Sequence, residues 1–226
     1  MESLKTLLAE KARRVGDKTY LYFRGRTFTY GEINVLSNKF ANAFHELGVR
    51  KGDHVAVMLP NCPEWIACWF GLAKLGAVLV AFNTQWRADG LAYALKQADI
   101  KSCLVAAEFQ GELKNSGKRP ELTRVILDLG GGPGEIESAQ ALSPRLSEAS
   151  ADEPEWEPPQ GSDPLIITYT SGTTGWPKAV VNPHWAYIAA AEDLRDYVQL
   201  DSDDIIYTCL PLYHANAQYY STMGSL

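Results

Sequence analysis

A loop of hydroxyl side chains and glycines between two apolar runs constrains this chain more than any other feature. Residues 166–181 read IITYTSGTTGWPKAVV, and both flanks are rich in β-forming residues. Glycines let backbone N–H groups approach an anion closely, hydroxyls add hydrogen-bond donors, and a lysine supplies a positive charge. This composition is typical of a loop that holds a polyphosphate. The candidate phosphate-binding residues are Thr170, Ser171, Gly172, Thr173, Thr174, Gly175 and Lys178.

The loop differs from the common Walker phosphate loop. The Walker pattern needs glycine directly before the lysine and Ser or Thr directly after it, and a helix opens there. Here Pro177 precedes Lys178, and Ala179, which has no hydroxyl, directly follows it. Residues 179–181 have the composition of a short strand, and Asn182 as N-cap with Pro183 at the first helical position predicts a helix start. We therefore predict strand, loop, strand and helix, with the loop in a hairpin-like connection.

Strands and helices alternate along most of the chain. A hairpin of β-formers is predicted around Arg24-Gly25, between residues 19 and 29. Helices are predicted over residues 30–47, 63–75 and 89–98. Buried strands are predicted over residues 54–59, 77–82, 100–106, 125–128 and 205–212. Strands separated by helices imply an α/β fold with largely parallel sheets flanked by helices.

The alternation breaks between residues 130 and 163. This stretch is acidic and rich in Pro, Gly and Ser, so we expect a surface connection without a core of its own. We place a subdomain boundary there. Residues 1–160 form a first α/β subdomain, and residues 161–226 begin a second α/β subdomain that carries the phosphate loop and is incomplete.

Composition narrows the partners and the compartment. The 226 residues are 46% hydrophobic with a net charge of −6, which is typical of a globular protein and argues against a general nucleic-acid-binding surface. Four cysteines in apolar contexts, without CxxC spacing, predict buried thiols. Because buried thiols suit a reducing compartment and the chain opens without a signal-peptide pattern, we expect a cytoplasmic protein.

One apolar stretch reaches about the minimum length of a membrane span. Residues 65–82 carry Lys74 in their interior, with Gly71 and Gly76 along the way. This pattern favours a buried helix followed by a strand over a transmembrane segment. Peripheral membrane contact stays open, and so does a homo-oligomer.

Three segments carry a resemblance to a known family. Residues 169–178 closely resemble the phosphate-loop signature of the adenylate-forming superfamily, which includes acyl-CoA synthetases, luciferases and peptide-synthetase adenylation domains. Residues 210–214, LPLYH, look like the family's Pro-x-aromatic-His segment. NCPEW at 61–65 and the run that follows are similar to the amino-terminal region of acyl-CoA ligases. NCPEW, the Lys178-Ala179 pair and HANAQ together look most like acyl-CoA ligases of the carnitine/crotonobetaine and fatty-acid-transport groups.

The resemblance implies the amino-terminal part of an AMP-forming acyl-CoA ligase. Such an enzyme joins a carboxylic acid to AMP, using Mg²⁺ and ATP, and then transfers the acyl group to coenzyme A. Lys178 would neutralise phosphate or the departing pyrophosphate. Tyr213 and His214 would lie between the acyl pocket and the adenylate, with His214 as the catalytic candidate. If a helix starts at His214, Gln218 would place a polar group near the acyl substrate; Asn216 as a helix N-cap is the open alternative.

Several parts of the family pattern fall outside these 226 residues. Members are usually more than twice this length, and the Mg²⁺-holding Glu segment, the ribose-binding Asp and the carboxy-terminal lid with its lysine are not in this sequence. We therefore expect the chain alone to be inactive. A non-catalytic nucleotide-binding or assembly module stays open, whereas the loop sequence disfavours a Walker-type NTPase. No residue is assigned as a metal ligand, because the acidic cluster at 201–204 is typical of a solvated turn.

Overall fold

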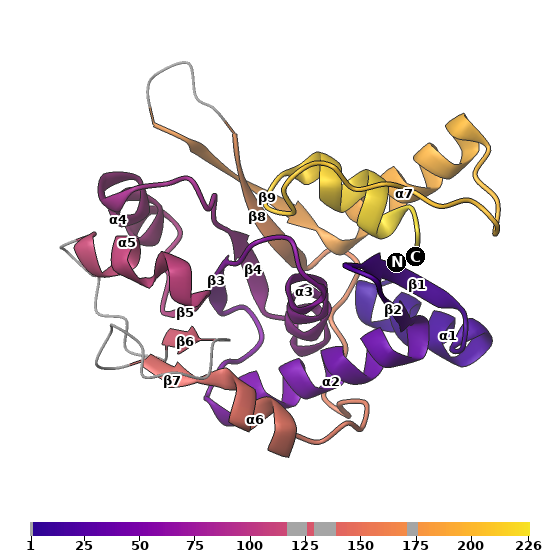
Figure 1. Ribbon diagram of the computed structural model, residues 1–226, viewed down its shortest axis with the longest axis horizontal. Coiled ribbons are helices and arrows are strands. Elements are labelled where there is room, and N and C mark those ends of the chain that lie inside the picture. Colours follow the sequence, from indigo (N-terminus) through magenta and orange to yellow (C-terminus); the bar gives the residue numbers. More distant parts are fainter. Residues whose placement is uncertain (1, 117–125, 129–138, 171–175) are drawn as a thin grey trace.

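The chain folds around one mostly parallel sheet (Figure 1). The computed structural model describes residues 2–116, 126–128, 139–170 and 176–226. Their strands are β1 (Thr19–Phe23), β2 (Arg26–Thr29), β3 (His54–Met58), β4 (Val78–Ala81), β5 (Ser102–Val105), β6 (Ile126–Asp128), β7 (Ala139–Ala141), β8 (Pro164–Thr170) and β9 (Lys178–Pro183). Within the described residues, seven strands form a sheet in the order β7-β6-β5-β3-β4-β8-β9. All neighbours in it are parallel except β8 and β9.

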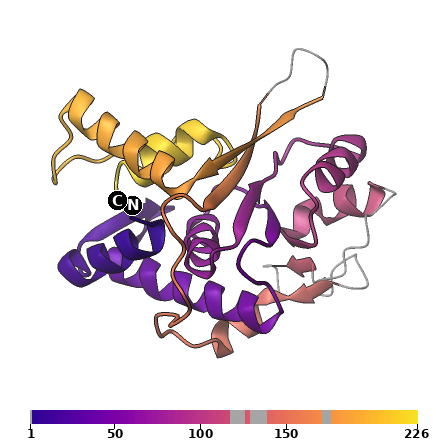
Figure 2. The same cartoon turned by 180° about the vertical axis from the view of Figure 1, so that it is seen from behind.

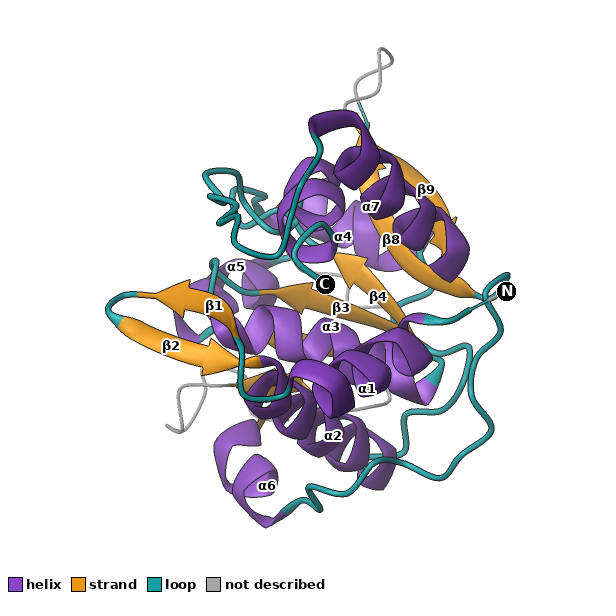
Figure 3. Cartoon of the chain, turned by 90° about the vertical axis from the view of Figure 1, so that its right-hand side faces the viewer, coloured by secondary structure: helices purple, strands orange, loops and turns teal. Residues whose placement is uncertain are grey.

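Helices cover both faces of this sheet. They are α1 (Leu4–Val15), α2 (Tyr30–Glu46), α3 (Pro63–Leu75), α4 (Ala88–Gln97), η1 (Ala107–Phe109), α5 (Gln110–Asn115), α6 (Leu142–Glu148), α7 (His184–Val198) and the π-helix η2 (Ala217–Met223). Figure 3 shows β3 and β4 between α4 on one side and α1, α2 and α3 on the other. The predicted α/β fold, with a largely parallel sheet flanked by helices, is confirmed.

Alternation along the central strands explains the two-sided core. Val55 and Val57 of β3 pack in the cluster built with α1, α2 and α3, whereas Ala56 and Met58 pack in the cluster built with α4 and α5. Successive side chains of a strand point to opposite faces, so a continuous apolar strand needs cover on both sides. The short apolar runs of the sequence are therefore the signature of this sheet.

Helix α3 is the buried helix predicted for the long apolar stretch. It begins at Pro63, and Gly76 follows it with φ 72°. A Cβ at Gly71 would lie 2.6 Å from Cβ of Phe40, so the glycine lets α2 and α3 approach closely. Among the described residues, no helix is both long enough and apolar enough to cross a membrane.

Lys74 lies wholly inside this core and is fully hydrogen-bonded. Its Nζ donates to Asn34 Oδ1 at 2.7 Å, to Asn38 Oδ1 at 2.6 Å and to Glu153 Oε2 at 2.6 Å. Burial lowers the pKa of Lys74 to about 8, and the Glu153 carboxylate opposes that shift. The pair joins α3 to the connection before β8.

That connection is more ordered than its composition predicts. Residues 139–148 form β7 and α6, and Leu142 belongs to the main core. The rest is held through both backbone and side chains: Lys5 Nζ donates to Pro154 O at 2.7 Å, and the Trp156 ring stacks on His45 at 4.3 Å. The prediction of a surface connection without a core of its own stays a prediction, because residues 130–138 lie outside the described part of the chain and Leu142 packs in the main core rather than in a separate one. Polar side chains of α1, α2 and α3 supply the partners that the segment cannot provide for itself.

The subdomain boundary after residue 160 stays a prediction. The strand that follows it, β8, pairs in parallel with β4 through Leu79 with Ile166 and Val80 with Ile167. The sheet of the first part therefore continues into the second.

Two predicted element boundaries are wrong. Residues 205–212 form no strand, and Ile205 and Tyr207 are 75% and 84% exposed. A strand needs a hydrogen-bonding partner, and none of the described strands pairs with this segment. Helix α7 begins at His184, one residue later than predicted, because Asn182 is still paired with Ile166 in the sheet. The N-cap is therefore Pro183, which makes no side-chain bond.

The cysteine prediction holds for two of the four residues. Cys68 and Cys103 are buried, and burial raises the pKa of the Cys103 thiol to about 12. Cys62 is only partly buried, and Cys209 is exposed on the irregular 205–212 segment. The expectation of four buried thiols is wrong at Cys209, because the strand that would bury it does not form.

We expect Lys74→Met to lower the free energy of unfolding by about 3 kcal/mol, since Glu153 and two asparagine oxygens would lose their buried donor. Urea unfolding with an unchanged slope would measure this change. The control is Lys51→Met, which removes a partly exposed pair with Asp163 and should cost under about 1 kcal/mol. Equal effects of the two variants would contradict the assignment.

His184 generates a second prediction, because it is buried in its neutral form. The Leu4 N–H donates to His184 Nδ1 at 3.2 Å, Nε2 has no hydrogen-bond partner in the described part of the chain, and burial lowers the pKa to about 4. The unfolded chain binds this proton near the ordinary pKa of about 6.5, so stability present above that pH is lost as the pH falls toward 4. The loss from this group is on the order of 3 kcal/mol.

His184→Asn keeps an acceptor for Leu4 N–H but does not titrate. We expect the free energy of unfolding of this variant to fall less steeply between pH 6.5 and pH 4 than that of the wild type. The difference in slope should correspond to about one proton fewer taken up on unfolding, measured by denaturant titrations at a series of pH values. An unchanged slope would show that His184 does not carry this dependence.

Candidate functional site

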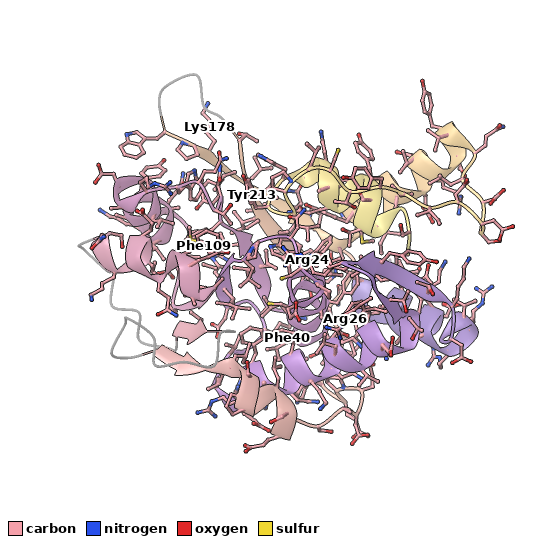
Figure 4. All side chains as sticks on the ribbon, in the orientation of Figure 1. Arg24, Arg26, Phe40, Phe109, Lys178 and Tyr213 are labelled. Carbon is pink, nitrogen blue, oxygen red and sulfur yellow. The ribbon has the colours of Figure 1, made fainter. Side chains whose placement is uncertain are left out.

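The predicted phosphate loop sits at the tip of a hairpin. Strands β8 and β9 are antiparallel, with Thr170 opposite Lys178 and Tyr169 opposite Ala179. The two strands predicted on either side of the loop are confirmed. Figure 4 shows Lys178 at the upper end of this hairpin, where its side chain is exposed. The remaining predicted phosphate ligands lie outside the described residues: Ser171, Gly172, Thr173, Thr174 and Gly175.

Helix α4 holds both strands of the hairpin. The Tyr169 hydroxyl on β8 donates to Ala94 O at 3.2 Å, and its ring meets Trp86 edge-on at 4.9 Å. Trp176, just before β9, stacks on Tyr93 of α4 with ring centroids 4.8 Å apart and an interplanar angle of 21°. Burial raises the pKa of Tyr169, so its hydroxyl keeps the proton that it donates. The strands therefore enter the loop from fixed positions.

A second candidate segment precedes η2. Tyr213 is buried and His214 exposed, and their ring centroids lie 4.5 Å apart. The His214 N–H donates to Pro211 O at 3.0 Å, which closes a turn rather than ending a strand. Figure 4 places Tyr213 below Lys178, on a different part of the chain from the hairpin.

Side-chain amides hold this turn on both sides. Asn61 Nδ2 donates to Leu210 O at 2.9 Å, and Asn61 Oδ1 accepts from Leu212 N at 2.7 Å. On the other side, Gln218 Nε2 donates to Leu212 O at 2.7 Å, and the Tyr187 hydroxyl donates to Gln218 Oε1. Both amides thus bond the backbone that leads into Tyr213.

The predicted common helix face of His214 and Gln218 stays a prediction, since one backbone hydrogen bond joins the two residues. The Gln218 N–H donates to His214 O at 3.4 Å, at the start of η2, and Asn216 makes no side-chain cap bond. Gln218 is fully buried. Its predicted contact with the acyl substrate stays a prediction, although both ends of its amide are bonded within the protein.

Sequence reasoning missed Asn61 and Tyr187 as members of this site. Asn61 opens the NCPEW run, which entered the analysis only through its resemblance to acyl-CoA ligases. A side chain that bonds a distant backbone leaves no periodic signal in the sequence. Tyr187 looks like one more apolar position of its helix.

No metal ligands are assigned. Among the residues that the structure describes, no three His, Cys, Asp or Glu side chains are placed to hold a metal ion.

Comparison with known families supplies the deciding observation. The sequence profile of the family described as AMP-binding enzyme matches residues 8–226. The chain belongs to the AMP-binding enzyme family.

A curated relative and two solved structures agree with the family assignment. The AMP-binding chain is 32% identical over 231 residues to crotonobetaine/carnitine–CoA ligase of Salmonella paratyphi A, covering 98% of this chain and 44% of that protein. It matches the N-terminal domain of FACL13 from Mycobacterium tuberculosis with a TM-score of 0.85 and 31% identity, covering 99% of this chain and 55% of the other. MbtA from Mycobacterium smegmatis matches with a TM-score of 0.89 and 25% identity, covering 99% of this chain and 42% of the other.

The predicted resemblance to the amino-terminal portion of adenylate-forming acyl-CoA ligases is confirmed. The chain spans less than half the length of the curated relatives that it matches. Activity, substrates and partners of the whole protein are therefore matters for proposal.

The stack between Tyr93 and Trp176 generates a prediction. Tyr93→Ala should shift the emission of Trp176 to longer wavelength and lower stability by about 1 kcal/mol, because half of the stack is lost. Tyr93→Phe keeps the stack and should behave like the wild type. The Trp176 signal is obtained by subtracting the spectrum of Trp176→Phe, and identical emission in all Tyr93 variants would refute the stack.

Proposed function

We propose that this protein activates a carboxylic acid with ATP to an acyl-adenylate and transfers the acyl group to coenzyme A. The observation that supports it most strongly is the TSGTTGWPK sequence at the tip of the β8–β9 hairpin, in a chain of the AMP-binding enzyme family. The curated relatives named above are ligases that use coenzyme A. The acyl substrate of this protein is a carboxylic acid of undetermined class.

The reaction has two displacements. A carboxylate oxygen attacks the α-phosphorus of Mg·ATP, and the bond from that phosphorus to the oxygen bridging to the β-phosphate breaks, releasing pyrophosphate. The thiolate of coenzyme A then attacks the acyl carbon, and the bond to the adenylate oxygen breaks, releasing AMP. Both steps need alignment of reactants and stabilisation of phosphate charge more than covalent help from the protein.

The hairpin supplies the charge stabilisation. Hydroxyls of Thr170, Ser171, Thr173 and Thr174 and the backbone at Gly172 and Gly175 would donate to the β- and γ-phosphates. Lys178 would neutralise the departing pyrophosphate, and its exposed position at the hairpin end suits an incoming anion. Thr170 and Lys178 face each other across the register, so both would approach the phosphates from the base of the loop.

The turn before η2 supplies the acyl side. Tyr213 and His214 would lie between the acyl pocket and the adenylate, and the imidazole of His214 could donate to the carboxylate. Gln218 would contribute polarity to this region. Carboxylic acid and coenzyme A are the proposed partners, and nucleic acid is not among them.

A cytoplasmic location is proposed on the free buried thiols Cys68 and Cys103. Peripheral membrane contact and homo-oligomer formation stay predictions.

Replacement of the hairpin lysine tests the proposed function. In the protein as its host produces it, Lys178→Ala should lower carboxylate-dependent exchange of pyrophosphate into ATP about tenfold, because a cation that faces the leaving group is lost. Lys178→Arg keeps the charge and should retain most of the rate.

Lys96→Ala is the control for loss of an exposed lysine, since Lys96 lies in the last turn of α4. It should leave exchange unchanged. Wild-type exchange in Lys178→Ala would overturn the role of Lys178, and no exchange with any carboxylate in the unmodified protein would overturn the function.

A further inference from the structure

Two side chains bond the backbone of one residue, Leu212, and a third side chain bonds one of those two. Asn61 comes from the connection between β3 and α3, Gln218 from η2, and Tyr187 from α7. Asn61 Oδ1 accepts a hydrogen bond from the Leu212 N–H at 2.7 Å, and Gln218 Nε2 donates to the Leu212 carbonyl at 2.7 Å. Leu212 lies two residues before His214, so its orientation sets the direction in which the turn leaves.

Two of these three side chains are anchored in the core. Tyr187 is fully buried, lying edge-on to Trp69 at 5.3 Å and stacked on Tyr219 at 4.2 Å. Gln218 is also fully buried, with its Oε1 bonded by the Tyr187 hydroxyl. Asn61 lies two residues before Pro63, the first residue of the core helix α3. Gln218 and Tyr187 are therefore held by the core, whereas Asn61 is exposed beside the start of α3.

The segment that they hold has little support of its own. Residues 205–210 form no helix or strand, and Ile205, Tyr207 and Leu210 are exposed. The Asn61 amide replaces a missing strand partner, because it offers a donor to Leu210 O and an acceptor to Leu212 N from one planar group. A carboxylate or an aliphatic side chain could not do both.

We propose that Asn61 and Gln218, with Tyr187 behind Gln218, are positioning residues that orient Tyr213 and His214 for the acyl step. This inference rests on the proposed function for its chemical meaning, and it moves Gln218 from a substrate contact to a support of His214. Asn61 and Gln218 act through the backbone of Leu212, and Tyr187 acts through Gln218.

The kinetic test is a double-mutant cycle in the protein as its host produces it. Asn61→Ala should lower kcat/KM for the carboxylate about fivefold, with the KM for ATP changed by less than about twofold. In a His214→Ala background, Asn61→Ala should have a smaller effect, because only Tyr213 is then left for Asn61 to position. Independent, multiplicative effects in the double variant would overturn the proposal.

Matched variants separate positioning from general loss of packing. Asn42→Ala removes another asparagine that bonds two backbone groups, in this case the carbonyls of Ser150 and Asp152. It should leave kcat/KM unchanged. Asn61→Asp keeps the acceptor for Leu212 N–H without the donor to Leu210 O, and should fall between wild type and Asn61→Ala. Tyr187→Phe removes only the hydroxyl that bonds Gln218, and should act in the same direction as Asn61→Ala.

A spectroscopic arm makes the outcome independent of catalysis. The Cε1–H signal of His214 should move in Asn61→Ala and Tyr187→Phe, whereas the signals of His45, His54 and His184 should stay in place. An unchanged His214 signal would overturn the inference even in an active enzyme. If the unmodified protein forms no acyl-adenylate, the proposed function fails, and the His214 signal still decides whether Asn61 positions it.

Discussion

The parallel pairing of β8 with β4 is the interaction on which the candidate site depends. Leu165 and Ile166 of β8 are fully buried and Ile167 is 3% exposed, so the strand is seated with both faces in the core. Beyond that pairing, β8 and β9 continue as an antiparallel pair, whose orange strands Figure 2 shows extending toward the upper right. An isolated two-stranded hairpin is marginally stable in water. Its pairing with β4 and its aromatic contacts with Trp86 and with Tyr93 of α4 hold this end of the hairpin in place.

The two parts of the site are held by different kinds of contact. The rings of Trp86 and Tyr93 hold the hairpin, whereas amide side chains hold the turn before His214. Ring stacking tolerates small sliding, but a planar amide bonded to two backbone groups fixes both distance and direction. A polyphosphate contacted by many donors can accept the first kind of support. A single imidazole aimed at one carboxylate needs the second.

Local chemistry in the sequence was enough to predict the elements that depend on it. The β1–β2 hairpin forms around Arg24 and Gly25, both with positive φ, and α2 begins with a capping box between Thr29 and Glu32. Glycine after α3 ends that helix in the left-handed conformation. The apolar runs of β3, β4 and β5 predicted a sheet covered on both faces, because nothing else buries such runs.

Features set by distant partners could not be predicted in this way. Residues 205–212 have the composition of a strand, but the described strands leave them no partner. The acidic connection before β8 is bonded by Lys5, Asn38 and Lys74. These residues lie 149, 113 and 79 positions before the residues that they contact. Asn61 shows the same limit within the site: its amide has meaning only once Leu212 is beside it.

The most direct test of the account follows an oxygen atom through the reaction. A carboxylate labelled with oxygen-18 is supplied with Mg·ATP and coenzyme A to the protein as its host produces it, and the nucleotide products are analysed by mass spectrometry. Attack of the carboxylate on the α-phosphorus predicts AMP that carries one labelled oxygen, together with unlabelled pyrophosphate. Formation of ADP, or of AMP without label, would contradict the account, because neither can arise from an acyl-adenylate cleaved by a thiol.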